Sequence, residues 1–297
     1  RSCYHFDTPT FIIEPIYFPV PAVVPKMMRF TYYELRQTIW MCVHMIRING
    51  NTITSADLGM YIRPGSIKQK IAAQMMQNDA VYTYSSLDAL NFELDARASI
   101  VNMSERLNNS LFSFKLFKNS ICNEAYWDRT YEGGFRLKRE AKPHEAIRDI
   151  LKNSRLYGTE CATAIVIVFY LGLVEVMPEG LFDRLFADIY LMDWKYLDRD
   201  LGVRTYGGVK NSLPGDCLYF INPDVNSETP EWQGENVIQL LNGYYYGHGI
   251  GITTANAIIR ELNRNRFPGS QTSAYLLDQI VKPDYRYLAM RMKEYNE

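Results

Sequence analysis

The chain has 297 residues, of which 47% are hydrophobic and 22% charged, a composition that supports a folded core and excludes wholesale disorder. Its 32 Lys and Arg residues nearly balance 33 Asp and Glu residues, which gives a net charge of −1. Such a chain has no overall positive field to attract nucleic acid or an anionic membrane surface, so we expect neither partner.

The first predicted element is a helix near residues 31–48, where Thr31 and Glu34 have the spacing of a capping box. Apolar residues then recur at helical spacing in two further segments, which predicts helices over residues 67–77 and 86–107. Residues 135–139 are expected to form a strand, and Pro143 to begin the next helix.

The most hydrophobic helix is predicted to begin near Cys161 and to end before Pro178. Its apolar run is shorter than the roughly 20 residues that a membrane-spanning helix needs, so we expect it in a protein core. Three strands follow, over residues 217–221, 235–241 and 244–252, and then a helix over residues 255–262. Helices first and antiparallel strands second indicate an α+β fold, with helices packed against a small antiparallel sheet.

A hairpin between the second and third of these strands brings two polar side chains together. Asn242-Gly243 is typical of a two-residue turn, and this turn would place Val237 opposite His248. Glu235 and His248 would then be diagonal neighbours on one face of the sheet. Glycines crowd this region, either as bulges or because something approaches the backbone closely. They are Gly234, Gly247, Gly249 and Gly251.

Cys161 is the candidate nucleophile because the positive end of a helix dipole favours a thiolate. The alternative is a small buried hydrophobic residue, as many free cysteines are. Glu160 next to it is either a first-turn acid favoured by the dipole or a catalytic group. The five cysteines and four histidines are scattered without ligand spacing, so we expect reduced thiols, no metal site and no cofactor.

Four sequence blocks resemble the bacterial spore-coat transglutaminases, the protein-glutamine γ-glutamyltransferases. They are residues 157–164 (YGTECATA), 214–223 (PGDCLYFINP), 231–238 (EWQGENVI) and 246–251 (YGHGIG). The resemblance covers residues 52–297, which we expect to form the catalytic domain. Residues 1–51 lie outside it, as an extension particular to this chain or an artefact.

The resemblance implies a single papain-like core similar to cell-wall peptidases of the NlpC type, and a calcium-independent enzyme. It implies that Cys161 is the nucleophile and that Glu235 and His248 are important for activity, with Glu160 as a possible alternative acid. It also implies transfer of a protein glutamine acyl group to a lysine amine through a Cys161 thioester. The implied partners are spore coat proteins, the implied state is a monomer, and the implied location is the mother-cell cytoplasm and then the spore coat.

A thioester that must survive in water needs an apolar, narrow site. Aromatic residues near the predicted strands are available to line a substrate tunnel. They are Trp194, Trp232, Tyr244, Tyr245 and Tyr246. Two other functions remain open at this point. One is a cysteine peptidase or amidase of the NlpC type that acts on cell-wall peptides and uses the same Cys161 and His248. The other is a non-catalytic structural protein of the coat.

Overall fold

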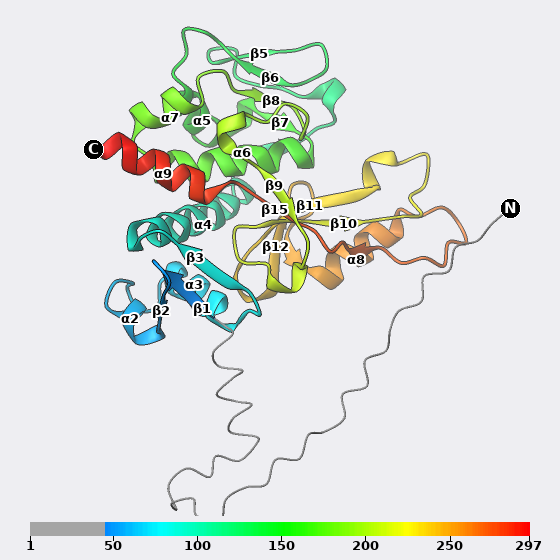
Figure 1. The fold of residues 1–297 in the computed structure, drawn as a ribbon. Coiled ribbons are helices and arrows are strands. Elements are labelled where there is room, and N and C mark those ends of the chain that lie inside the picture. Colours follow the sequence, from blue (N-terminus) through cyan, green and yellow to red (C-terminus); the bar gives the residue numbers. More distant parts are fainter. Residues whose placement is uncertain (1–44) are drawn as a thin grey trace, which may run out of the picture. The chain divides into compact units, whose positions relative to one another are not determined.

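The computed structural model describes residues 45–297, which form a mixed α+β fold (Figure 1). The α-helices are α2 (Ser55–Gly59), α3 (Ile67–Gln77), α4 (Leu87–Asn108), α5 (Pro143–Lys152), α6 (Cys161–Val174), α7 (Glu179–Leu185), α8 (Ala255–Arg264) and α9 (Tyr285–Asn296). Among these residues, no helix has both the length and the hydropathy needed to cross a membrane.

The main sheet is antiparallel, with the strand order β13-β12-β11-β10-β15-β9, and β14 pairs with β10. Its strands are β9 (Arg204–Tyr206), β10 (Cys217–Ile221), β11 (Gly234–Gln239), β12 (Tyr244–Gly247), β13 (Gly251–Thr254), β14 (Tyr275–Leu276) and β15 (Ile280–Lys282). Helix α6 packs against β11 on one side of the sheet. The other side is covered by α8, which lies across the strands from α6 in Figure 1.

Helix α6 forms the centre of the core because it has no polar stripe. Every residue from Ala162 to Val174 is buried, as expected of a helix that is apolar all round. Helix α4 crosses it closely at Gly172, where an added Cβ would lie 2.4 Å from a side-chain atom of Ile100. The close approach of α4 therefore depends on glycine at this position. The first residue of the helix is Cys161, so the core holds this residue in place.

Two smaller sheets and a strand pair complete the described fold. The three-stranded sheet β2-β1-β3 packs with α2 and α3, and its strands are β1 (Met45–Ile48), β2 (Asn51–Ile53) and β3 (Val81–Tyr84). The second sheet contains β5 (Trp127–Arg129), β6 (Phe135–Leu137) and β8 (Tyr190–Leu191). Strand β4 (Ser113–Phe114) pairs with β7 (Gly158–Thr159) just before α6.

The helix predicted near residues 31–48 is not found over residues 45–48, the part of it that the structure describes. Residues 45–48 form strand β1, which pairs with β2 and β3, and the rest of that prediction lies outside the described residues. An apolar residue at every third or fourth position does not exclude a strand, because pairing with neighbouring strands can override a local helical pattern. Ile46 is fully buried in this sheet.

The predicted hairpin register is wrong by one residue. Val237 pairs with Gly247 rather than with His248, and Ile238 pairs with Tyr246. The loop holds three residues, Leu241–Gly243, instead of two. Asn242 and Gly243 do take positive φ angles of 59° and 75°, as the Asn-Gly pair predicts, but Leu241 joins the loop. Because neighbouring side chains in a strand point to opposite faces, this shift puts each β12 side chain on the opposite face from the one predicted relative to β11.

Other predicted elements are confirmed. Helices α3, α4 and α6 begin close to the expected residues, and Ser86 caps α4 by accepting a hydrogen bond from the Ala89 N–H. Strand β10 has the predicted bounds. The predicted strand over residues 244–252 is instead divided into β12 and β13 by a turn that contains His248, since Gly249 and Gly251 adopt positive φ angles there.

Candidate active site

Cys161 lies at the wall of a cavity of about 510 Å³ at the start of α6. Its lining residues come from residues 114–118 at and after β4, the start of α6, the loop after β8, and strands β10 and β11 with the loop between them. They are Phe114, Leu116, Phe117, Lys118, Glu160, Cys161, Ala162, Asp193, Tyr219, Pro230, Glu231, Gln233, Gly234 and Asn236. The thiol is partly buried, so a substrate that enters the cavity can reach it.

Glu160 caps the helix that carries the thiol. Its carboxylate accepts hydrogen bonds from the Ala162 and Thr163 N–H groups at 2.6 and 2.7 Å. These are two of the N–H groups that a helix start leaves without an intrahelical acceptor. Burial raises the pKa of the Glu160 carboxyl, these two hydrogen bonds oppose the rise, and Asp193 adds to it. To act as a catalytic acid, Glu160 must release the cap.

Glu235 is buried at the start of β11, where its side chain lies over Gly247 of β12. A Cβ added at Gly247 would lie 2.8 Å from the Glu235 Oε1 atom and 3.0 Å from its Cγ. Glycine at 247 thus provides the room for the carboxyl group. Oε1 is buried without a hydrogen-bond partner in the described part of the chain. Burial raises the pKa of Glu235, and the nearby Glu160 carboxylate raises it further.

Asn236, not singled out in the sequence, is the strand residue that contacts the thiol. Its side-chain Nδ2 lies 3.7 Å from Cys161 Sγ and donates a hydrogen bond to it. Asn236 also lines the cavity, whereas Glu235 does not. Among residues 45–297, Glu235 forms no hydrogen bond to the thiol. The signal that could have singled out Asn236 is side-chain alternation along β11, because Ile238 on the same face is buried in the cluster that contains α6.

The thiol is less acidic than its place at a helix start suggests. Burial raises the pKa of Cys161, and the Glu235 and Glu160 carboxylates raise it further. Hydrogen bonds from Asn236 act in the opposite direction but do not outweigh these effects. The resting thiol is therefore protonated, and a thiolate has to be formed by moving its proton to a neighbouring group.

His248 has both ring nitrogens engaged away from the thiol. Nε2 lies 3.2 Å from the Ser113 carbonyl oxygen, and Nδ1 lies 3.1 Å from the Tyr246 hydroxyl. Because a carbonyl only accepts, Nε2 carries the proton and Nδ1 accepts from the hydroxyl. Burial lowers the pKa of His248 to about 4, so the ring is neutral at pH 7. Its ring packs on Phe112 and Phe114, which ties the β12–β13 turn to a wall of the cavity.

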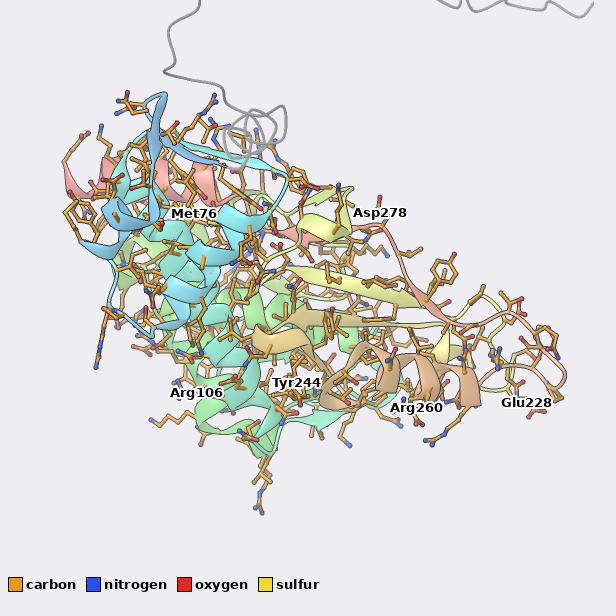
Figure 2. All side chains as sticks on the ribbon, turned by 90° about the horizontal axis from the view of Figure 1, so that it is seen from below. Met76, Arg106, Glu228, Tyr244, Arg260 and Asp278 are labelled. Carbon is orange, nitrogen blue, oxygen red and sulfur yellow. The ribbon has the colours of Figure 1, made fainter. Side chains whose placement is uncertain are left out.

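None of the aromatic residues expected to line a tunnel contributes to this cavity. Trp194 packs on Phe169 of the core, and Trp232 packs on the opposite cluster beneath α8. Tyr246 is buried against His248, and Tyr245 packs on Phe220. Tyr244 is about half exposed and lies between Arg106 of α4 and Arg260 of α8 in Figure 2. The apolar walls are formed instead by Phe114, Leu116, Phe117 and Tyr219.

The charged lining of the cavity is mainly acidic. Glu160, Asp193 and Glu231 contribute carboxylates, and Lys118 is the one basic residue among the lining residues. Asp193 has a positive φ of 51°, which Asp tolerates better than most residues, and its N–H donates to Thr163 Oγ1 at 2.8 Å. Thr163 lies two residues after Cys161, so this hydrogen bond fixes the Asp193 backbone relative to the Cys161 thiol.

The comparisons with known proteins point to one family. A family model described as protein-glutamine gamma-glutamyltransferase matches residues 45–293 and so begins before the expected boundary at residue 52. Proteins of that name from Bacillus mycoides (strain KBAB4) and Bacillus cereus (strain B4264) are each 46% identical to this chain, over 75% of its length and 80% of theirs.

A solved structure shows the same fold. It is described as transglutaminase from Geobacillus stearothermophilus (without C-terminal extension). The two chains are 48% identical with a TM-score of 0.67, and the match covers 70% of this chain and 98% of that one. With a family match over most of its length and close relatives of the same name, this chain belongs to the protein-glutamine γ-glutamyltransferase family.

Proposed function

We propose that this protein cross-links other proteins by transferring the acyl group of a glutamine side chain to a lysine amine, with Cys161 as the nucleophile. The observation that carries the proposal is the cavity at the start of α6, where Cys161 is open to a substrate beside an amide donor and several carboxyl groups. A nucleophile at a helix start, packed against an antiparallel sheet, also supports a papain-like core.

The reaction proceeds in two acyl-transfer steps. Glu235 accepts the thiol proton, and the Cys161 sulfur attacks the glutamine carboxamide carbon. The C–N bond then breaks and ammonia leaves with a proton from the acid, which gives a γ-glutamyl thioester. A lysine amine attacks the thioester and loses one proton to the carboxylate, and the Cys161 thiolate leaves. The raised pKa of Glu235 suits this exchange, because burial and the nearby Glu160 carboxylate increase its affinity for the thiol proton.

The electrostatics of the cavity support a cationic second substrate. Its carboxylates at Glu160, Asp193 and Glu231 attract the lysine ammonium group and raise its local concentration. The apolar side chains of Phe114, Phe117 and Tyr219 limit the access of water, which would otherwise hydrolyse the thioester to glutamate. His248 has a structural role. It links the β12–β13 turn to strand β4 and so holds Phe114 in the wall of the cavity.

The finer parts of the proposal follow from the resemblance to the spore-coat enzymes. We infer that the enzyme needs no calcium, acts as a monomer on spore coat proteins, and works in the mother-cell cytoplasm and then in the coat. Bacillus relatives of the same family are consistent with a role in sporulation. Calcium independence is tested by full activity in a chelator.

The decisive experiment measures incorporation of a fluorescent primary amine into a glutamine-rich protein, with chelator present. We expect incorporation by the wild type and by Cys122→Ala, and none by Cys161→Ala. Cys122 is the matched control because it is a partly buried thiol outside the cavity. Cleavage of a cell-wall peptide without amine incorporation would show that the protein is a cysteine peptidase of the NlpC type instead. Equal activity of the wild type and Cys161→Ala would refute Cys161 as the nucleophile.

A further inference from the structure

We propose that the Asn236 side-chain amide, together with the Cys161 main-chain N–H, binds the oxyanion that forms during acyl transfer at Cys161. This inference rests on the proposed acyl transfer and names the groups that stabilise its intermediate. Asn236 lies on β11, and its Nδ2 is 3.7 Å from the attacking sulfur. Among the described residues, Nδ2 makes no other hydrogen bond.

The position of Asn236 is fixed by the sheet. Ile238, two residues further along β11 and on the same face, is buried in the cluster that contains α6. Strand β11 pairs with β10 on one side and β12 on the other, so its backbone cannot move independently of the sheet. The amide is therefore aimed at the start of α6 before any substrate binds.

A second donor lies at the nucleophile itself. The Cys161 N–H is at the first position of α6 and has no intrahelical acceptor. The Glu160 carboxylate takes the next two N–H groups, of Ala162 and Thr163, and leaves that of Cys161 free within the described part of the chain. Two N–H donors thus flank the sulfur, one from the helix and one from the sheet.

The chemistry requires such donors at this place. When the thiolate attacks the carboxamide, the new C–S bond forms while the C=O π electrons move to the oxygen, which becomes an oxyanion. When the C–N bond breaks, the oxygen regains its double bond. The oxyanion forms beside the Glu160 carboxylate, whose negative charge opposes it, and no cation contacts the sulfur among residues 45–297. Neutral N–H donors stabilise the oxyanion without a new charge in the cavity.

Replacing the amide should slow acyl transfer more than it slows other reactions of the thiol. We compare the wild type with Asn236→Ala and with Asn236→Asp, which keeps the shape and removes the donor. There are three readouts. They are ammonia release from a glutamine peptide, acylation of the Cys161 thiol by p-nitrophenyl acetate, and alkylation of the same thiol by chloroacetamide across pH. Alkylation forms no oxyanion, so it reports only the thiolate. The control Asn256→Ala removes an amide from the exposed face of α8.

We expect both acyl-transfer rates to fall about 10²–10³-fold in the Asn236 variants. The limiting alkylation rate at high pH should stay within about threefold, and Asn256→Ala should behave as the wild type. Equal losses in acyl transfer and alkylation would show that Asn236 only tunes the thiol, and unchanged acyl transfer would also overturn the inference. If the wild type reacts with the ester but not with glutamine, the proposed function fails while the ester rates still decide the role of Asn236.

Discussion

The buried carboxyl group of Glu235, the proposed acceptor of the thiol proton, also carries an energetic cost. Its Oε1 has no hydrogen-bond partner within residues 45–297, and its pKa is raised by burial and by Glu160. A carboxyl whose pKa is higher in the folded than in the unfolded state stays protonated while the unfolded chain ionises. Its contribution to stability therefore falls as the pH rises above the ordinary Glu range of about 4.3.

We expect Glu235→Gln to be inactive yet more stable than the wild type at pH 8, by about 1–3 kcal/mol. The gain in the free energy of unfolding should be smaller at pH 5, because the wild-type carboxyl is then closer to its protonated form. Urea unfolding at the two pH values measures the difference. A variant that is less stable than the wild type at pH 8 would contradict the assignment of Glu235 as an uncompensated buried acid.

Asp193 is expected to select a cationic amine as the second substrate. Asp193→Asn keeps a residue that tolerates the positive φ at this position and removes the charge. We expect the KM for a cationic primary amine to rise roughly fivefold, which corresponds to about 1 kcal/mol for a partly exposed charge pair. The KM for hydroxylamine, which is neutral at pH 7, should stay the same. Equal effects on both amines would exclude charge recognition by Asp193.

At the scale of elements, the contact between β11 and β12 fixes the position of the Glu235 side chain. Gly247→Ala would place a Cβ within 2.8 Å of Glu235 Oε1. We expect a loss of about 1–3 kcal/mol in stability from overpacking, together with a loss of activity, because the carboxyl group must move. Thermal unfolding and amine incorporation test both effects.

The matched control is Gly59→Ala at the end of α2. An added Cβ at Gly59 meets no atom within 4 Å, and the backbone there is not left-handed. We expect unchanged activity and a neutral or slightly positive effect on stability. Equal behaviour of the two alanine variants would show that the room beside Gly247 is larger than the structure indicates.

The elements that could be predicted from sequence are those whose local signals agree with their packing. Helix α6 is apolar throughout, and α4 has Ser86 as its cap, so periodicity and capping located both. The hairpin register could not be predicted, because the same Asn-Gly pair fits loops of two and three residues. Cys161 and Glu235 do meet near one cavity, yet the contact of Asn236 with the thiol depends on that register.

At the scale of the whole described fold, a buried ion cluster on α4 connects the sheet β2-β1-β3 with the main sheet. Arg97 is fully buried and donates to Glu93 and Asp216 at 2.8 Å each. Tyr84 of β3 donates to Glu93 at 2.9 Å, and Asp216 directly precedes β10. The cluster therefore holds three parts of the fold together, namely strand β3, helix α4 and the start of β10.

Arg97→Ala should cost about 3–5 kcal/mol, because it leaves two buried carboxylates without their cation. The control Lys210→Ala removes a largely exposed partner of Asp79 and should cost at most about 1 kcal/mol. Urea unfolding of both variants measures the costs. A loss below about 1 kcal/mol for Arg97→Ala would show that the cluster does not hold the three parts together.

The protonated state of the Cys161 thiol also bears on the durability of the enzyme. Peroxides attack thiolates far faster than thiols, and burial with two nearby carboxylates keeps this sulfur in its thiol form until its proton is removed. The same surroundings that oppose formation of the thiolate therefore slow the formation of sulfenic acid. An enzyme built in this way trades some catalytic speed for resistance to oxidative inactivation between encounters with its substrates.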